Sequence, residues 1–188
     1  MNNPAPFADA AVRASTEADL PAIQAIYAHH VLHGLASFEE VPPDAAEMDR
    51  RRAAILGDGL PHLVAEAGGD ILGFAYAGPY RPRSAYRFTV EDSVYVDAGA
   101  TGRGIGSLLL AALLNDCEAW GARQMLAVIG DSGNLGSIRL HARAGFRHAG
   151  KLAAVGFKHG RWVDCVLMQR ALGPGDATLP QDRRAQPR

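Results

Sequence analysis

The segment that most constrains the fold runs from Glu91 to Leu110, with the sequence EDSVYVDAGATGRGIGSLLL. Residues 89–96 have the Val and Tyr content of a strand in the middle of a sheet. A glycine-rich turn follows, and an apolar helix begins at about Ile105. Such a turn offers backbone N–H groups and a positive helix end to a phosphate. Because the strand also carries acidic residues, the segment predicts an enzyme with a phosphorylated cofactor beside a proton acceptor.

The composition excludes several classes of partner. The chain of 188 residues is 48% hydrophobic and 21% charged, as expected for one ordinary globular domain. Its formal net charge of −1 gives no general attraction to nucleic acid or to a membrane, so neither is expected as a partner. The N-terminus lacks the regions of a secretory signal, and the apolar runs are too short to span a bilayer. Cys117 and Cys165 match no metal or disulfide pattern, which indicates buried thiols, no metal and a cytoplasmic protein.

Hydrophobic periodicity predicts the element order β-α-α-β-β-β-α-β-α-β-β. Strands are expected at about 12–14, 62–66, 71–77, 89–96, 125–129, 146–157 and 162–169. Helices are expected at about 16–32, 44–56, 105–119 and 134–144. This order indicates an α/β (α+β) fold whose mixed, mostly antiparallel central sheet is flanked by helices, and it argues against a regular βαβ alternation.

The two ends differ in composition from the middle of the chain. Residues 1–10 are short and Pro/Ala-containing, which predicts a flexible N-terminus. Residues 11–171 are expected to form one domain. The tail at 172–188 is rich in Pro, Gly and charge from Gly173 onward and has no periodicity, so it is predicted to be disordered.

The glycine turn itself fits neither common nucleotide-binding fingerprint, because the lysine of GxxxxGK[ST] and the spacing of GxGxxG are absent. The pattern (Q/R)xxGxG before a long apolar helix does fit, and it resembles the pyrophosphate-binding turn of the GNAT acetyltransferases. Thr101 stands where Gln or Arg is usual. The resemblance implies acetyl-CoA as co-substrate, held by the strand and turn residues Val94, Tyr95, Val96, Thr101, Gly102, Arg103, Gly104, Ile105, Gly106 and Ser107. A tight connection without any ligand is the alternative.

The segment NLGSIRLHARAGF, residues 134–146, resembles the NxxSxxLHxxxGF segment of the same superfamily. The resemblance implies that Asn134 and Ser137 contact the cofactor. It also places His141 near the leaving thiolate, which needs a proton and so favours a general acid there. The alternative is that Asn134 caps a helix and His141 only packs.

Two longer blocks narrow the family. YAGPYRPRSAYRFTVE, residues 76–91, and GFKHGRWVD, residues 156–164, resemble the phosphinothricin (methionine sulfoximine) N-acetyltransferases. The similarity covers about residues 11–171 and departs from the family at Phe88, where Trp is common. It implies a GNAT acyltransferase fold, a homodimer, and acetyl transfer from acetyl-CoA to the α-amino group of a small amino acid.

The same resemblance assigns Glu91 as the base that accepts the amine proton, directly or through a water. Side chains alternate along a strand, so Glu91 and Asp92 are not expected to enter one cleft, and Asp92 is interpreted as structural. A salt bridge from Glu91 to an arginine is the alternative. The strand around Val94 and Val96 also resembles the family's splayed strand, and the resemblance implies that a backbone amide there polarises the thioester carbonyl.

The acceptor is expected to contact an aromatic and basic set of side chains. Guanidinium forks and a phenol match the oxygens of a phosphinate, sulfoximine or sulfone. The predicted residues are Phe38, Tyr76, Arg81, Arg83 and Tyr86. The alternative is a solvated basic loop. His159, Arg161 and Trp162 are expected to shape the site or a subunit interface.

Two other functions stay open on the sequence. An acetyltransferase could act on a protein N-terminus, a polyamine or an antibiotic, although the basic segment 80–87 disfavours a cationic acceptor. A module that binds single-stranded RNA is the other class, and the near-neutral charge argues against it.

Overall fold

A seven-stranded sheet in the order β1-β2-β3-β4-β5-β7-β6 forms the centre of the computed structural model, which describes residues 9–180. The strands are β1 (Ala11–Ala14), β2 (His62–Ala67), β3 (Asp70–Pro79), β4 (Thr89–Val96), β5 (Gln124–Gly130), β6 (Arg147–Lys158) and β7 (Arg161–Ala171). The helices are α1 (Leu20–His33), α2 (Ala45–Gly57), α3 (Ile105–Trp120) and α4 (Leu135–Arg143). The predicted element order and the mostly antiparallel sheet are confirmed.

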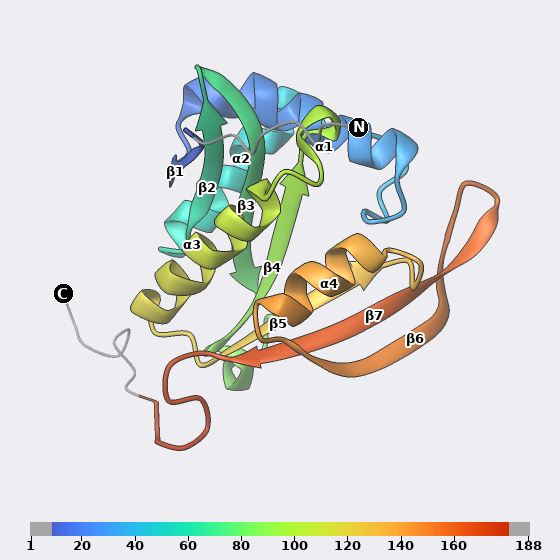
Figure 1. Cartoon of the computed structure of the whole chain (residues 1–188). Coiled ribbons are helices and arrows are strands. Elements are labelled where there is room, and N and C mark those ends of the chain that lie inside the picture. The colour runs from blue at the N-terminus through green and yellow to red at the C-terminus, as the bar shows by residue number, and fades with distance from the viewer. Residues whose placement is uncertain (1–8, 181–188) are drawn as a thin grey trace.

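One pair of strands breaks the antiparallel pattern. β4 and β5 are parallel and pair only from Thr89 with Gln124 to Asp92 with Ala127. Beyond that point β4 stays with β3, whereas β5 stays paired with β7 as far as Gly130. The two strands therefore diverge in the middle of the sheet, as Figure 1 shows.

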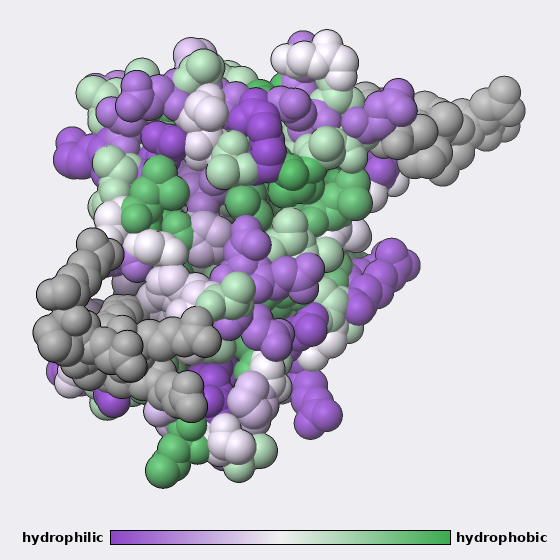
Figure 2. Space-filling view, turned by 90° about the vertical axis from the view of Figure 1, so that its left-hand side faces the viewer, coloured by the Kyte–Doolittle hydropathy of each residue, from purple (hydrophilic) through white to green (hydrophobic). Residues whose placement is uncertain are grey.

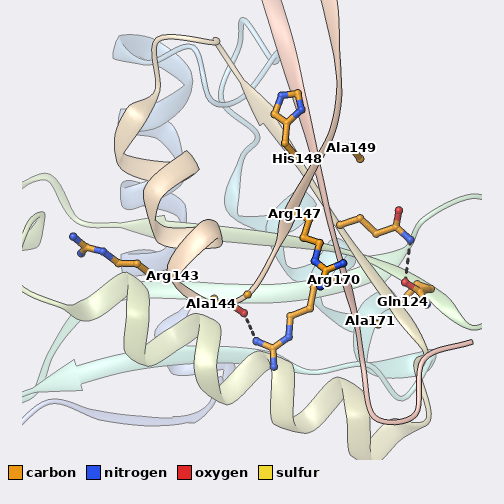
Figure 3. Close-up of a pocket in the computed structure, with 10 residues that line it drawn as sticks. Gln124, Arg143, Ala144, Arg147, His148, Ala149, Arg170 and Ala171 are labelled. Carbon is orange, nitrogen blue, oxygen red and sulfur yellow. Dashed lines mark hydrogen bonds between the residues drawn. The ribbon is translucent and has the colours of Figure 1, made fainter. Parts of the chain in front are cut away.

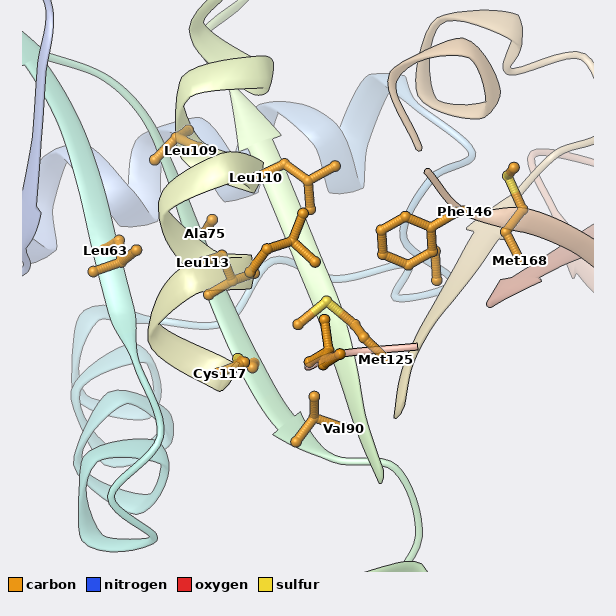
Figure 4. Packing of buried hydrophobic residues seen from close by; sticks show 14 of the residues in the cluster. Leu63, Ala75, Val90, Leu109, Leu110, Leu113, Cys117, Met125, Phe146 and Met168 are labelled. Carbon is orange, nitrogen blue, oxygen red and sulfur yellow. The ribbon is translucent and has the colours of Figure 1, made fainter. Parts of the chain in front are cut away.

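Helices cover the sheet on two sides, with α3 and α4 in front of it and α1 and α2 behind it in Figure 1. The larger core lies under α3, where Leu109, Leu110 and Leu113 pack against Val90 and Met125 (Figure 4). A second core lies under α1 and α2 and is made of Ile23, Ile26, Tyr27, Val31, Met48, Val64 and Phe74. Alternation along the strands sends adjacent residues to different cores, which ties both helical layers to one sheet.

The helix starts follow their capping residues. Thr16 and Asp19 form a capping box, and the Thr16 amide donates to Asp19 at 2.7 Å. The box opens a short 3-10 turn, Glu17–Asp19, so α1 begins at Leu20, later than predicted. Asp44 caps α2 by accepting the Glu47 amide at 2.8 Å.

Two boundary predictions need correction. The strand expected to end at about residue 77 is longer, because Gly78 and Pro79 pair with Glu91 and Val90 and belong to β3. Proline is tolerated there because it ends the strand. Part of the segment expected as a disordered tail is folded, since Leu172 is buried and Arg123 donates to the carbonyls of Gly175 and Thr178. Residues 181–188 and 1–8 lie outside the described residues.

The two edges of the sheet differ. β1 is short, and its Arg13 forms ion pairs with Asp19 and Glu66. Charge on an edge strand opposes pairing with another chain. On the side that Figure 2 shows, hydrophobic groups are interspersed among hydrophilic residues. Among residues 9–180, no helix is long and apolar enough to cross a membrane.

Candidate active site

The divergence of β4 and β5 leaves backbone groups of β4 without a strand partner. The Asp97 amide donates to Leu72 on the β3 side, and backbone groups alternate sides along a strand. The N–H groups of Val94 and Val96 therefore face the opening. The Val96 carbonyl faces it as well and is bonded by His30 Nε2 at 2.9 Å. A preorganised amide at Val94 is suited to stabilise charge on an oxygen.

Two cavities meet at this opening, one of about 510 Å³ and one of about 760 Å³. Both are lined by Ala36, Val94, Tyr95, Gly130, Asn134 and Ser137. The smaller cavity also contains Glu91, and the larger one contains the glycine turn. A molecule in the larger cavity can therefore present a reactive group to a second molecule in the smaller one.

The larger cavity is suited to a phosphorylated ligand. Gly102 and Gly104 have φ of 74° and 89°, which side chains rarely adopt, so the turn requires glycine there. Gly104 is the N-cap of α3, and no side chain within residues 9–180 caps the helix, which leaves first-turn amides open to an anion. Arg139 and Arg143 line the same cavity and add positive charge. These residues fit the diphosphate of acetyl-CoA.

Glu91 is the acid of the smaller cavity whose carboxylate has no bonded partner among the described residues, whereas Glu39 is bonded by Arg51 and Asp92 by His141. Among residues 9–180, no hydrogen bond or ion pair holds its carboxylate, so the alternative of a salt bridge to an arginine is not observed. Burial raises the pKa of Glu91, the charge of Asp92 raises it further, and Arg81 opposes both. A carboxylate with a raised pKa is a better proton acceptor than an exposed glutamate.

An aromatic wall lines the smaller cavity, which Glu91 also lines. Phe38 and Tyr76 line it, and burial raises the pKa of Tyr76, which hydrogen-bonds Ser93. The loop that carries Phe38 is fixed by β6, because the buried Lys158 ammonium donates to the Ser37 carbonyl at 2.6 Å. Beside it, the Phe38 ring lies directly against Gly156, where a Cβ would come within 2.3 Å of Cε2.

His141 is buried, lines the same cavity and contacts the other acid of β4. Its Nε2 lies 2.9 Å from Asp92 Oδ2, and its Nδ1 lies 2.8 Å from the Ser137 carbonyl and 3.3 Å from Ser137 Oγ. Burial lowers the pKa of His141, but the hydrogen bond and charge of Asp92 outweigh burial and the pKa is raised. Both ring nitrogens are thus engaged within the protein.

The structure gathers most of the residues that the sequence singled out. Glu91, His141, Phe38 and Tyr76 line the smaller cavity. The larger cavity is lined by the predicted residues Val94, Tyr95, Val96, Thr101, Gly102, Gly104, Ile105, Gly106, Ser107, Asn134 and Ser137. Asn134 also caps α4 by accepting the Ser137 amide, so the two interpretations of Asn134 are compatible.

Four predicted residues line neither cavity, namely Arg81, Arg83, Tyr86 and Arg103. Arg81 lies over the Tyr80 ring, and Tyr80 packs edge-on against Tyr86. The expectation that Asp92 stays out of the cleft was wrong, because Glu91 and Asp92 both line the smaller cavity. The parallel ladder ends at Asp92, so the cavity at the opening borders both residues.

Sequence reasoning missed the residues that position the side chains of the site. Lys158 and Gly156 fix the Phe38 loop, and Asp92 holds His141. The sequence carried one usable signal, an acidic residue next to Glu91 inside a buried strand. No pattern in the sequence links Lys158 to Ser37, because they are far apart in the chain.

A separate cavity of about 750 Å³ lies beyond the C-terminal end of α4 (Figure 3). It holds the basic side chains of Arg143, Arg147, His148 and Arg170, and Arg170 donates to the Ala144 carbonyl. No carboxylate lines it, and it contains neither Glu91 nor the glycine turn. Within residues 9–180 no group of three His, Cys, Asp or Glu side chains could hold a metal ion.

A glycine cradle for a diphosphate, an open strand amide and an isolated carboxylate define an acetyl-CoA-dependent N-acetyltransferase. The chain belongs to the acetyltransferase (GNAT) family, whose model matches residues 25–146.

Two curated enzymes and one solved structure are close relatives. The chain is 60% identical over 170 residues to the phosphinothricin N-acetyltransferase of Alcaligenes faecalis, an alignment that covers 90% of this chain and 86% of that one. It is 43% identical to the L-methionine sulfoximine/L-methionine sulfone acetyltransferase of Pseudomonas paraeruginosa, over 88% and 96% of the two chains. A phosphinothricin acetyltransferase from Sinorhizobium meliloti in complex with acetyl-CoA superposes with a TM-score of 0.90 at 48% identity, covering 93% and 95% of the chains.

Proposed function

We propose that this protein transfers the acetyl group of acetyl-CoA to the α-amino group of phosphinothricin, methionine sulfoximine or methionine sulfone. The observation that carries the proposal is the unpaired carboxylate of Glu91, which lines a smaller cavity walled by Phe38 and Tyr76 that adjoins a CoA-type cavity. The names of the similar enzymes supply the acceptor class.

The proposed chemistry starts with the amine. An ammonium group cannot attack a thioester, so it must first lose a proton, and Glu91 accepts it directly or through a water. The Val94 amide, which faces the opening, stabilises the negative charge that develops on the thioester oxygen during attack. Glu91 releases the proton to solvent after the product leaves.

We assign the binding of the acceptor's charged groups to the basic loop at residues 80–87. The charge of Arg81 acts on Glu91, which places the guanidinium within electrostatic reach of the cavity. Arg83 and Tyr86 lie on the same loop, and all three are partly or fully exposed. We assign to this loop the carboxylate and the phosphinate or sulfone oxygens of the acceptor, because arginine and phenol groups match them.

The decisive experiment measures free CoA thiol after mixing the protein with acetyl-CoA and a panel of amines. The panel contains the three proposed acceptors, common amino acids, a polyamine and a peptide N-terminus. Turnover confined to the peptide or the polyamine, or no turnover at all, would refute the proposal.

A variant tests the base separately. Glu91→Gln should lower kcat by about a hundredfold or more, because general base catalysis contributes roughly 10²–10⁴, while acetyl-CoA binding measured by calorimetry stays unchanged. Glu17→Gln, in the exposed 3-10 turn before α1, is the matched control. Wild-type kcat in Glu91→Gln would remove Glu91 from the mechanism.

We also propose a homodimer formed through the β6 edge. β6 is a long edge strand, and at the end of its hairpin Phe157 and Trp162 are 57% and 68% exposed and pack on each other. An exposed apolar edge favours pairing with another copy, whereas β1 is blocked by ion pairs. Trp162→Glu should yield a monomer by light scattering, and Leu179→Glu, which changes an exposed leucine elsewhere, should not.

The proposed setting is the cytoplasm. Cys117 and Cys165 are free and buried, which agrees with a reducing compartment. Acetylation of phosphinothricin there would give the host resistance to that herbicide, and growth of an expressing strain on phosphinothricin tests this directly.

A further inference from the structure

The Asp92–His141 pair lies next to the reaction site, but neither ring nitrogen of His141 is free to reach a substrate. The two side chains are 2% and 4% exposed. Phe146 packs edge-on against the imidazole, with ring centroids 5.0 Å apart, and holds the ring in place. His141 therefore cannot swing toward the larger cavity without losing both hydrogen bonds.

The contacts of the ring fix where its protons are. The Ser137 carbonyl can only accept a hydrogen bond, so His141 Nδ1, at 2.8 Å, carries a proton. Nε2 and Asp92 Oδ2, at 2.9 Å, must also share a proton. The pair thus holds one proton more than a neutral imidazole beside a carboxylate. The other oxygen of Asp92, Oδ1, is buried and has no hydrogen-bond partner among the described residues, so the carboxylate depends on His141.

Ser137 connects this proton to the substrates. Its hydroxyl oxygen lies 3.3 Å from His141 Nδ1, and Ser137 lines both cavities at their junction. Serine hydroxyls donate and accept at once, which is what a relay requires. Ser137 is the hydroxyl residue of α4 that connects His141 to the junction of the two cavities, where the acetyl group is transferred.

We propose that Ser137 donates the proton that the CoA thiolate needs as it leaves, and that the buried Asp92–His141 pair replaces it. The inference rests on the proposed acetyl transfer and adds the acid half of the reaction. Ser137 is the catalytic residue here, and Asp92 and His141 are positioning residues that act through it.

The step balances in protons and electrons. The carbon–sulfur bond breaks and its electron pair goes to sulfur, which takes the proton of Ser137 Oγ. His141 Nδ1 gives its proton to Ser137 Oγ, and the imidazole becomes neutral with its remaining proton on Nε2, donated to the Asp92 carboxylate. The amine nitrogen forms its bond to the acetyl carbon as this carbon–sulfur bond is lost, and it gives up two protons in all. Glu91 takes the first before attack, and the second leaves the nitrogen once the new bond has formed. Both pass to solvent, one proton from solvent restores the pair, and one proton is released overall.

The charged and titratable groups around His141 favour its protonated form. On β4, Glu91 and Asp92 are adjacent acids, and on α3 the Cys117 thiol senses the charge of Asp92. Burial raises the pKa of Cys117 to about 12, so the thiol stays neutral and adds no charge. Asp92 is the charged group that acts on His141, and it acts to keep the ring protonated.

The kinetic test removes the Ser137 hydroxyl and leaves the Asp92–His141 pair in place. Ser137→Ala should lower kcat with acetyl-CoA by about 10²-fold, the scale of general acid catalysis, a much larger change than in the acetyl-CoA affinity measured by calorimetry, to which Ser137 contributes one contact in the larger cavity. Ser137→Thr, which keeps a hydroxyl, should restore most of the rate. Ser132→Ala is the matched control, because Ser132 donates to Asp164 and lines neither cavity.

The spectroscopic test reads the protons directly. Nitrogen NMR of the histidine rings at pH 7 should show both nitrogens of His141 protonated in the wild type and one protonated in Asp92→Asn. Because the acid works below its pKa, the high-pH limb of kcat should move to lower pH in Asp92→Asn. Asp116→Asn on exposed α3 sequence is the control.

Each outcome decides the inference. Wild-type kcat in Ser137→Ala, or a neutral His141 at pH 7 in the wild type, would overturn it. If Asp92→Asn does not fold, the wild-type spectrum and the Ser137 variants still decide. Absence of turnover with every proposed acceptor would refute the proposed function, whereas the spectrum of His141 would still stand as the test of the pair.

Discussion

The contact between Phe38 and Gly156 predicts that one methyl group on β6 weakens acceptor binding. A Cβ at Gly156 would lie 2.3, 2.7 and 2.8 Å from three atoms of the Phe38 ring. Carbon atoms that are not bonded approach to about 3.5–4.0 Å, so Gly156→Ala must displace either the ring or the strand. Phe38 is 41% exposed and can turn toward solvent, so the ring moves and β6 keeps its place.

The size of the effect follows from what the ring does. Overpacking typically costs about 1–3 kcal/mol. Here the Phe38 ring relieves the clash by turning away, and the acceptor then loses that wall of the smaller cavity. Since about 1.4 kcal/mol is tenfold in an equilibrium constant, the KM for the acceptor should rise about tenfold. The KM for acetyl-CoA should stay near the wild-type value, because neither Phe38 nor Gly156 lines the larger cavity.

The assay is thiol release at varied acceptor and saturating acetyl-CoA, with thermal unfolding measured in parallel. Gly150→Ala is the matched control, since Gly150 is also in β6 and a Cβ there meets nothing within 4 Å. A double-mutant cycle with Phe38→Leu adds a second check. In the leucine background the Gly156→Ala change should cost much less, because the clashing ring is gone.

Three results would refute this reasoning. An unchanged acceptor KM in Gly156→Ala would mean that Phe38 does not contact the acceptor. An equal rise in the KM of acetyl-CoA would mean that the whole opening is distorted. Additive effects of Gly156→Ala and Phe38→Leu would mean that the two residues are not coupled.

Two further predictions concern pH. Burial, and then the charge of Arg52, lower the pKa of His62 from 6.5 to about 4, so the unfolded chain binds a proton first as the pH falls. The free energy of unfolding should therefore drop by about 3 kcal/mol between pH 6.5 and 4, and His62→Phe should flatten that slope in urea unfolding; an unchanged slope would contradict the assignment. Arg81 lowers the pKa of Glu91, against burial and Asp92, which raise it. Arg81→Met should therefore move the low-pH limb of kcat/KM to higher pH, because the base works above its pKa, whereas Arg83→Met should leave the limb in place; equal shifts in both would argue against a direct effect of Arg81.

Local patterns predicted the element order correctly because each signal spans a few residues. Asp44, for example, caps α2 through Glu47, three positions away. The glycine turn was equally local, since the positive φ of Gly102 and Gly104 demands glycine whatever lies around it. The acceptor wall was not predictable in this way. Phe38 is held by Gly156 and by Lys158 bonding Ser37, which are contacts between opposite ends of the chain.

The loop at 80–87 shows a different limit. Its arginine and tyrosine content matches the proposed acceptor, but composition does not determine where the side chains point. Arg83 and Tyr86 line neither cavity. Tyr86 packs edge-on against Tyr80, a local contact that the sequence could not weigh against a ligand. Which side of the loop meets the acceptor depends on tertiary structure and, under the proposed dimer, on the other copy.

The end of the parallel ladder at Asp92 explains why the active site lies where it does. If β4 and β5 paired for two more residues, the Val94 amide would bond β5 and could not bind a substrate oxygen. The Phe38 loop helps to keep them apart, because a Cβ at Gly130 of β5 would lie 2.3 Å from the Leu35 carbonyl. Glycine at 130 thus lets the loop backbone pack beside β5 at the opening. Glu91 and the buried Asp92 both line the cavity at this divergence, so one break in strand pairing supplies the amide, the base and the Asp92–His141 pair.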